Sequence, residues 1–92
     1  MTDTPRTETM IQEFPSEFPI KVMGRHDSDL RAQTQLIIER HAGRMDDASV
    51  RTRTSADGNF LAVTYTVVAT SREQLDNIYR ELTACKAVLM AL

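Results

Sequence analysis

Residues 20–23 are the first stretch in which apolar and polar side chains alternate, and Gly24 ends it. A period of two is typical of a half-buried β-strand, because successive side chains point to opposite faces of a sheet. We therefore predict a first strand here. Its core face consists of Phe18, Ile20 and Val22, and its opposite face carries Lys21 and Met23.

The next stretch repeats its apolar positions at helical spacing. The repeating positions are Leu30, Gln33 or Thr34, Ile37, Ile38 and His41. We expect Asp27 or Ser28 to cap the start of this helix, since short polar side chains accept hydrogen bonds from the free N–H groups of a first turn. Ala42 and Gly43 are expected to end the helix.

Two further strands follow, joined by a tight turn. Residues 50–54 alternate Val and Thr with Arg51 and Arg53, and the pair Asp57-Gly58 is typical of a hairpin. The strand after this turn, residues 59–69, has the longest alternation in the chain. We predict its core face to be Leu61, Val63, Tyr65, Val67 and Ala69, and its other face to be Phe60, Ala62, Thr64, Thr66 and Val68.

A second helix and a last strand complete the pattern. Ser71 and Gln74 match the S-x-x-Q capping box, in which the serine side chain accepts a hydrogen bond from the backbone N–H three residues on. Helical spacing then continues. The apolar positions are Leu75, Ile78, Tyr79, Leu82 and Cys85. The apolar residues 87–92 are predicted to form the last strand.

The order β-α-β-β-α-β predicts a ferredoxin-like α+β sandwich: a four-stranded antiparallel sheet of order 4-1-3-2 with two helices on one face. The other face of such a sheet is free of helices. Here it would display Lys21, Met23, Phe60, Ala62, Thr64, Thr66 and Val68.

Composition separates a tail from a single domain. Residues 1–13 are polar and carry a net charge of −2, whereas residues 14–92 have ten bases and ten acids. We expect residues 1–13 to be a disordered tail and residues 14–92 to be one domain. The chain has one cysteine and no long apolar run, and its first residues do not resemble a signal peptide. These features favour the cytoplasm and exclude a membrane partner.

An ordered set of short segments is similar to the YbeD family of small bacterial proteins. The segments are Phe14-Pro15, Phe18, Lys21-Val22-Met23-Gly24, Arg40-His41-Ala42, Gly58-Asn59-Phe60, Ala69-Thr70, Ile78-Tyr79-Arg80-Glu81-Leu82 and Val88-Leu89-Met90-Ala91-Leu92. The resemblance covers residues 14–92. It implies a fold close to ACT-type regulatory domains, which bind amino acids or similar effectors and associate through their sheets. It implies no established activity, although some relatives are linked to the regulation of lipoate metabolism.

Two surfaces are candidate sites. The first is the turn around Gly24, Arg25 and His26, where the ACT resemblance implies that a small effector approaches the backbone and the free N–H groups of a helix. The second is the open sheet face, whose residues Lys21, Met23, Phe60, Ala62, Thr64, Thr66 and Val68 are partly apolar and would suit a protein interface.

Catalytic and nucleic-acid functions are disfavoured. No nucleophile, phosphate-binding or metal motif is present, so we expect no enzymatic activity, no metal and no cofactor. Cys85 and His41 are explained by packing and by a helix terminus. Asn59 and Leu61 occupy the positions where an RNA-recognition sheet carries stacking aromatics. Arg51 and Arg53 are expected to protect a sheet edge from unwanted strand addition.

These observations favour a non-enzymatic regulatory or interaction module that binds another protein, such as a metabolic enzyme, or a second copy of itself. The alternative is an ACT-like sensor of an amino acid or another small carboxylate. RNA binding is the least favoured of the three.

Overall fold

A computed structural model describes residues 14–92 of the chain. The predicted tail, residues 1–13, lies outside the described residues. The elements in chain order are β1 (Ser16–Arg25), α2 (Leu30–Ala42), the 3-10 turn η1 (Asp47–Ser49), β2 (Val50–Thr54), β3 (Phe60–Ala69), α3 (Arg72–Ala84) and β4 (Met90–Ala91).

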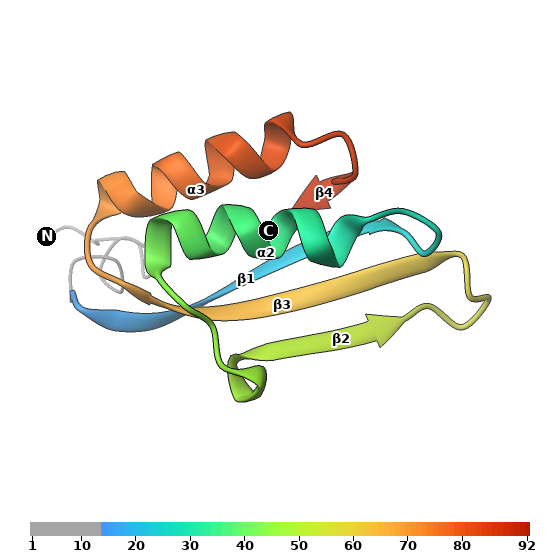
Figure 1. Ribbon diagram of the computed structural model, residues 1–92, viewed down its shortest axis with the longest axis horizontal. Helices are drawn as coiled ribbons and strands as arrows, with labels where there is room; N and C mark the ends of the chain where they lie inside the picture. Colours follow the sequence, from blue (N-terminus) through green and yellow to red (C-terminus); the bar gives the residue numbers. More distant parts are fainter. Residues whose placement is uncertain (1–13) are drawn as a thin grey trace, which may run out of the picture.

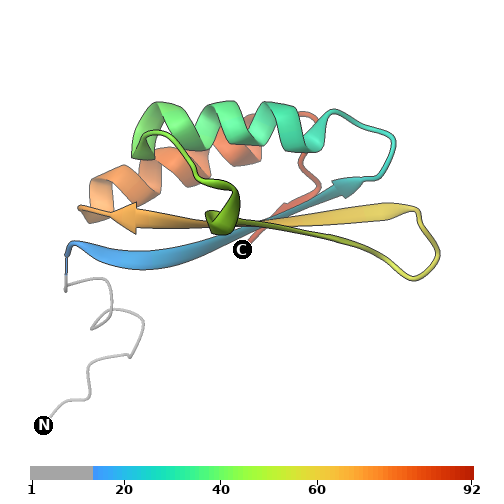
Figure 2. The ribbon, with the colours of Figure 1, turned by 60° about the horizontal axis from the view of Figure 1, so that its bottom comes forward.

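All strands belong to one antiparallel sheet of order β2-β3-β1-β4. This is the predicted order 4-1-3-2 written from its other end, so the ferredoxin-like fold is confirmed. Both helices cover the same face of the sheet (Figure 1). The view in Figure 2 shows the two layers edge-on, with α2 and α3 on one side of the strands.

β1 and β3 form the centre of the sheet. They pair along ten residues each, from Ser16 opposite Ala69 to Arg25 opposite Phe60. β1 is longer than predicted, because it begins at Ser16 and runs past Gly24, its expected end, to Arg25. It also passes through Pro19. The nitrogen of Pro19 points to the same side as that of Lys21, which bonds to the Leu92 carbonyl. β4 pairs with β1 only at Val22 and Met23, so the missing N–H of Pro19 costs no ladder bond with β4.

The core lies between the sheet and the two helices. Its fully buried members from the sheet include Ile20, Val22, Val63, Tyr65 and Val67, as the alternation predicts. The helices contribute Leu30, Ile37, Ile38, Leu75, Ile78 and Leu82. Leu61 is only half-buried, near the hairpin end of β3. The face assignment of both central strands is therefore correct.

The start of α2 differs from the prediction. The N-cap residue is Asp29, whose side chain makes no capping hydrogen bond, rather than Asp27 or Ser28. The backbone N–H and the hydroxyl of Ser28 both donate to the Arg25 carbonyl, at 3.1 and 2.7 Å. Ser28 therefore closes the preceding turn, and the helix begins after it. The predicted stop at Gly43 is confirmed, and this residue has a φ of 85°.

The predicted cap of α3 is present, and it also joins the two helices. The Ser71 hydroxyl accepts a hydrogen bond from the Gln74 N–H at 3.0 Å. The Gln74 side-chain oxygen accepts from the Thr70 N–H at 2.7 Å. The Gln74 amide nitrogen donates to the His41 carbonyl at 3.0 Å. One side chain thus satisfies backbone groups at the start of α3 and at the end of α2.

The C-terminal segment forms less strand than expected. The predicted strand over residues 87–92 is reduced to Met90–Ala91. Helix α3 ends at Ala84, with Cys85 as its C-cap, and the Val88 N–H donates to the Cys85 carbonyl at 3.0 Å. Residues 85–88 therefore form a turn, which leaves only the final residues free to pair with β1.

Candidate functional site

The sheet face opposite the helices is the first candidate site in the described chain. Directly paired residues of antiparallel strands share a face, so the register defines its members. One row across the sheet is Arg53, Ala62, Met23 and Met90. The next row is Arg51, Thr64 and Lys21, followed by Leu92, which exchanges two backbone hydrogen bonds with Lys21. We call this surface the open face.

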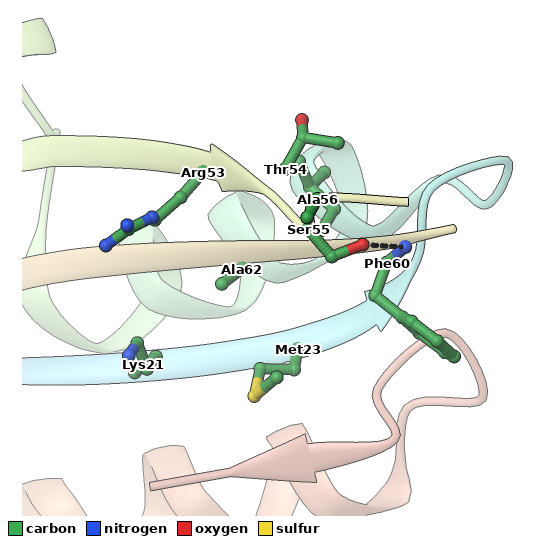
Figure 3. Close-up of a pocket in the computed structure, with 9 residues that line it drawn as sticks. Lys21, Met23, Arg53, Thr54, Ser55, Ala56, Phe60 and Ala62 are labelled. Carbon is green, nitrogen blue, oxygen red and sulfur yellow. Dashed lines mark hydrogen bonds between the residues drawn. The ribbon is translucent and has the colours of Figure 1, made fainter. Parts of the chain in front are cut away.

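Two shallow hollows lie on the open face, side by side over β3. One has a volume of about 390 Å³ and the other of about 440 Å³. Lys21, Arg53 and Ala62 line both. Figure 3 shows the side chains of Lys21 and Arg53 on either side of Ala62, with Met23 farther along β1. The hollows exist because the central strand carries small side chains here while its neighbours carry long ones.

The hairpin loop between β2 and β3 forms one end of the first hollow. Its geometry is set by Asp57, whose Oδ1 accepts hydrogen bonds from the Ser55 hydroxyl at 2.7 Å and from the Asn59 N–H at 3.0 Å. These bonds lower the pKa of the Asp57 carboxyl. The Ser55 hydroxyl also accepts from the Phe60 N–H at 3.0 Å (Figure 3). A hairpin was predicted at Asp57-Gly58, and Gly58 has the positive φ of 78° that such turns favour.

The open face is basic, although residues 14–92 as a whole are neutral. Its charged residues are Lys21, Arg25, Arg51 and Arg53 against Glu17. All five are exposed. Within the described part of the chain, ion pairs link only Arg40 and His41 with Glu81, on the helix layer. Lys21, Arg51 and Arg53, the three cations around the hollows, therefore have no carboxylate partner among residues 14–92.

Exposed apolar side chains surround these cations. Phe60 is 38% exposed and Val68 is 54% exposed, at opposite ends of β3. Met90 and Leu92, on the β4 side, are 50% and 61% exposed. Sequence reasoning placed Phe60 and Val68 on this face but missed the contribution of the C-terminal residues. The predicted role as a protein interface stays a prediction.

The strand register places Arg51 and Arg53 in a cluster of cations as well as on the edge of the sheet. Sequence reasoning assigned them to protection of the sheet edge, which their place on the outer strand β2 still allows. The structure also brings them beside Lys21, across β3. The sequence indicated this grouping only in that Arg51 and Arg53 are two residues apart and therefore point to the same face of their strand. Which other side chains they lie beside depends on the residues of β3 with which they pair.

Gly24, which lies within the last residues of β1 and not in the turn after it, is needed for the packing of the fold. A Cβ at Gly24 would lie 2.3 Å from the Ala87 carbonyl oxygen and 3.0 Å from Leu30 Cδ1. The space beside this glycine is therefore filled by the chain itself. Arg25 and His26 are exposed and line a smaller hollow of about 150 Å³ together with Asp27, Gly58 and Asn59. An effector site at Gly24, Arg25 and His26 stays a prediction.

The helix layer holds one polar cluster that sequence reasoning explained by the helix dipole alone. Arg40 and His41, in the last turn of α2, both contact the Glu81 carboxylate of α3, His41 through Nε2 at 2.7 Å. Hydrogen bonds lower the pKa of Glu81, and the one from Arg40 has a larger effect than the one from His41. Nearby, the half-buried Cys85 thiol donates to Gln33 Oε1 at 3.3 Å. These contacts join the two helices.

Within residues 14–92, no three metal-ligating side chains of His, Cys, Asp or Glu lie close enough together to hold an ion. A search of the same residues finds no helix with the length and hydropathy needed to cross a membrane.

Comparison with known proteins assigns the chain to a family. Residues 9–92 match the profile described as "Protein of unknown function (DUF493)". A UPF0250 protein of Bordetella pertussis is 48% identical over 83 residues, which is 89% of each chain. One from Leptothrix cholodnii is 47% identical over the full length of both chains, and one from Ralstonia nicotianae is 44% identical over 97% of this chain. The names of these relatives state no catalytic activity. The resemblance to the YbeD family is confirmed, and the chain belongs to the DUF493 family, also called UPF0250.

Proposed function

We propose that this protein is a regulatory interaction module that acts by binding another protein, and that the open face is its binding surface. The observation that carries this proposal is the combination, on one helix-free sheet face, of exposed apolar side chains and cations that have no carboxylate partner among residues 14–92. In our proposal the module works in the bacterial cytoplasm and catalyses no reaction itself. A metabolic enzyme, such as one of lipoate metabolism, is the class of partner that the YbeD resemblance suggests.

The composition of the open face supports this role. Interface cores are enriched in aromatic residues, methionine and arginine. The open face presents one Phe, two Met and three Arg, at Phe60, Met23, Met90, Arg25, Arg51 and Arg53. Helices cover only the opposite face, so a partner can approach without any rearrangement of the described residues (Figure 2). The long β1–β3 pairing makes this surface rigid, which limits the entropy lost on binding.

A pull-down with a pair of matched double variants tests the proposal. Phe60→Asp with Val68→Asp places two charges on the open face, and an interface would have to bury them without partners. Ala32→Asp with Leu36→Asp adds the same charge on the exposed side of α2. Partners captured by the parent chain from a lysate of cells that contain it would be identified by mass spectrometry.

We expect the open-face variant to lose a partner that the helix variant retains at the parent level. Circular dichroism and the melting temperature would establish that both variants are folded. Equal retention by both variants would overturn the assignment of binding to the open face. Loss only in the helix variant would move the interface to the helix layer.

The packing around Gly24 does not favour the alternative of a small-effector sensor. The approach to the backbone that it requires at Gly24 is occupied by Ala87 and Leu30 in this structure. Arg25 and His26 are accessible, so Arg25→Ala and His26→Ala are the variants with which to measure amino-acid binding.

A further inference from the structure

We propose that the open face recognises an acidic, extended segment of a partner protein, bound along β2 over Lys21, Arg51 and Arg53. This inference rests on the proposed function and specifies the chemistry of the partner. The observations behind it are the charge of the face, the spacing of its cations, the hollows between them and the exposure of β2.

The spacing of the arginines matches an extended ligand. Arg51 and Arg53 lie two residues apart on one face of β2. Side chains two apart on a strand are separated by about 7 Å, and an extended peptide repeats its own side chains with the same period. Acidic residues at alternate positions of a bound segment would therefore meet both guanidinium groups in turn.

Lys21 adds a third charge on the far side of the hollows. It lies opposite Thr64, which in turn lies opposite Arg51. Between the cations, Ala62 and Thr64 are short, and this leaves the hollows of about 390 and 440 Å³. Carboxylates in these hollows can accept paired hydrogen bonds from an arginine, the arrangement that makes arginine selective for planar anions.

The exposure of β2 leaves room for such a segment. β2 is an edge strand that pairs only with β3, and residues 51–54 are exposed whichever face they point to. The outer edge of β2 therefore has no neighbour among the described residues. In Figure 1 β2 lies at the margin of the sheet away from both helices.

The same charges argue against a second copy of the chain as the occupant. An interface between two open faces, or between two β2 edges, would bring the same cations, Lys21, Arg51 and Arg53, together from both copies. Like charges across an interface cost free energy and act against the wrong partner. An acidic segment turns this repulsion into attraction.

The surroundings of the cations favour a peptide over a nucleic acid. Phe60 is the only aromatic residue that the described chain presents on the open face, and it lies at one end of β3. A strand of bases would find no central stacking platform. The neighbouring exposed residues are instead aliphatic or methionine, at Val68, Met90 and Leu92.

Selection from a random peptide library tests the inference without knowledge of the partner. Random dodecamers displayed on phage would be selected on the full chain and, in parallel, on the variant Arg51→Glu with Arg53→Glu. The matched control is Arg44→Glu with Arg72→Glu, which changes the net charge equally at exposed positions outside the open face. We expect the parent and control pools to be enriched in Asp and Glu at alternate positions. The open-face arginine variant should lose that enrichment.

Synthetic peptides from the parent pool would then be titrated by fluorescence anisotropy. We expect affinity for the open-face arginine variant to fall on the order of tenfold or more, with less than about threefold change for the control. A pool with no acidic enrichment, or an acidic pool that the arginine variant binds equally well, would overturn the inference. A twelve-nucleotide single-stranded RNA that binds more tightly than any selected peptide, through the same arginines, would also overturn it.

The library separates this inference from the proposed function. A non-acidic pool that requires Phe60 and Val68 but not the arginines would contradict the acidic partner and leave the open face as the interface. A pool that binds all open-face variants equally would contradict both.

Discussion

The Tyr65 hydroxyl, from the middle of β3, lies 2.7 Å from the Thr34 hydroxyl of α2, and both side chains are fully buried. The Thr34 hydroxyl donates to the Leu30 carbonyl of α2 at 2.7 Å, so its oxygen accepts the hydrogen of Tyr65. The Arg31 carbonyl, 3.2 Å from the Tyr65 oxygen, is a second acceptor for the same hydrogen. No buried side-chain polar atom among the described residues lacks a partner. A polar link thus fixes α2 over the sheet from inside an apolar core.

A double-mutant cycle on this pair should show coupling. Tyr65→Phe and Thr34→Val should each lower the free energy of unfolding by about 1 kcal/mol, because each removes hydrogen bonds of the group. The double variant should lose less unfolding free energy than the sum of the two single losses, because neither of its side chains keeps a hydroxyl that lacks its partner. Urea titrations of the four proteins measure the cycle. Strict additivity would mean that the two hydroxyls do not interact.

Gly24 should be a structural requirement of the fold. Gly24→Ala brings a methyl group against the Ala87 carbonyl, whose backbone cannot move without disturbing the β4 pairing, so we expect a loss of about 2 kcal/mol or more. Gly58→Ala is the control, because its Cβ would meet nothing within 4 Å and its positive φ should cost about 1 kcal/mol. Denaturant titration measures the unfolding free energy of both variants. Comparable losses for Gly24→Ala and Gly58→Ala would show that the Ala87 carbonyl moves aside at little cost.

The Glu81 cluster predicts acid sensitivity. Because Arg40 and His41 hold the pKa of Glu81 below its usual value of 4.5, the stabilisation is fully present above that value and is lost as the pH falls through the lower folded value. Melting temperatures measured from pH 6 to pH 3 should therefore fall less steeply for Glu81→Gln than for the parent. Asp76→Asn, on the exposed side of α3, serves as the control. If the melting temperatures of the parent and of Glu81→Gln fall equally with pH, the Glu81 cluster is not a cause of the acid sensitivity.

Deletion of residues 1–13 should barely change the stability of the domain. These residues have few apolar side chains and no periodic pattern by which to pack. A fall of about 5 °C or more in the melting temperature, which corresponds to roughly 1 kcal/mol in a domain of this size, would show that they do pack. Thermal denaturation of the full and shortened chains gives the answer.

The sequence alone predicted the topology because each element carries its own local signal. The alternation in β3 identified the buried face that contains Val63 and Tyr65, and the Ser71–Gln74 box located the start of α3. Local signals failed where distant chain contacts decide the outcome. The polar residue at position 34 was recognised as part of a helix face, but its partner Tyr65 follows only from tertiary packing.

The same limit applies to the candidate site. The alternation assigned Lys21 to the open face and gave Arg51 and Arg53 a common face, but the cluster forms only through their pairing on opposite sides of β3. Met90 and Leu92 join the face because the C-terminal residues pair with Met23 and Lys21. Cross-strand register, rather than any motif, assembles this surface.

Methyl resonances on the two layers of the molecule test the central claim most directly. In a titration of the full chain with an enriched peptide or with the captured partner, NMR should show shifts of the Ala62 and Met23 methyl groups, which lie on the open face. The Leu36 methyl groups, exposed on α2, should not move. Shifts confined to Leu36 and its neighbours on the helix layer, with Ala62 and Met23 unchanged, would contradict the open face as the binding surface.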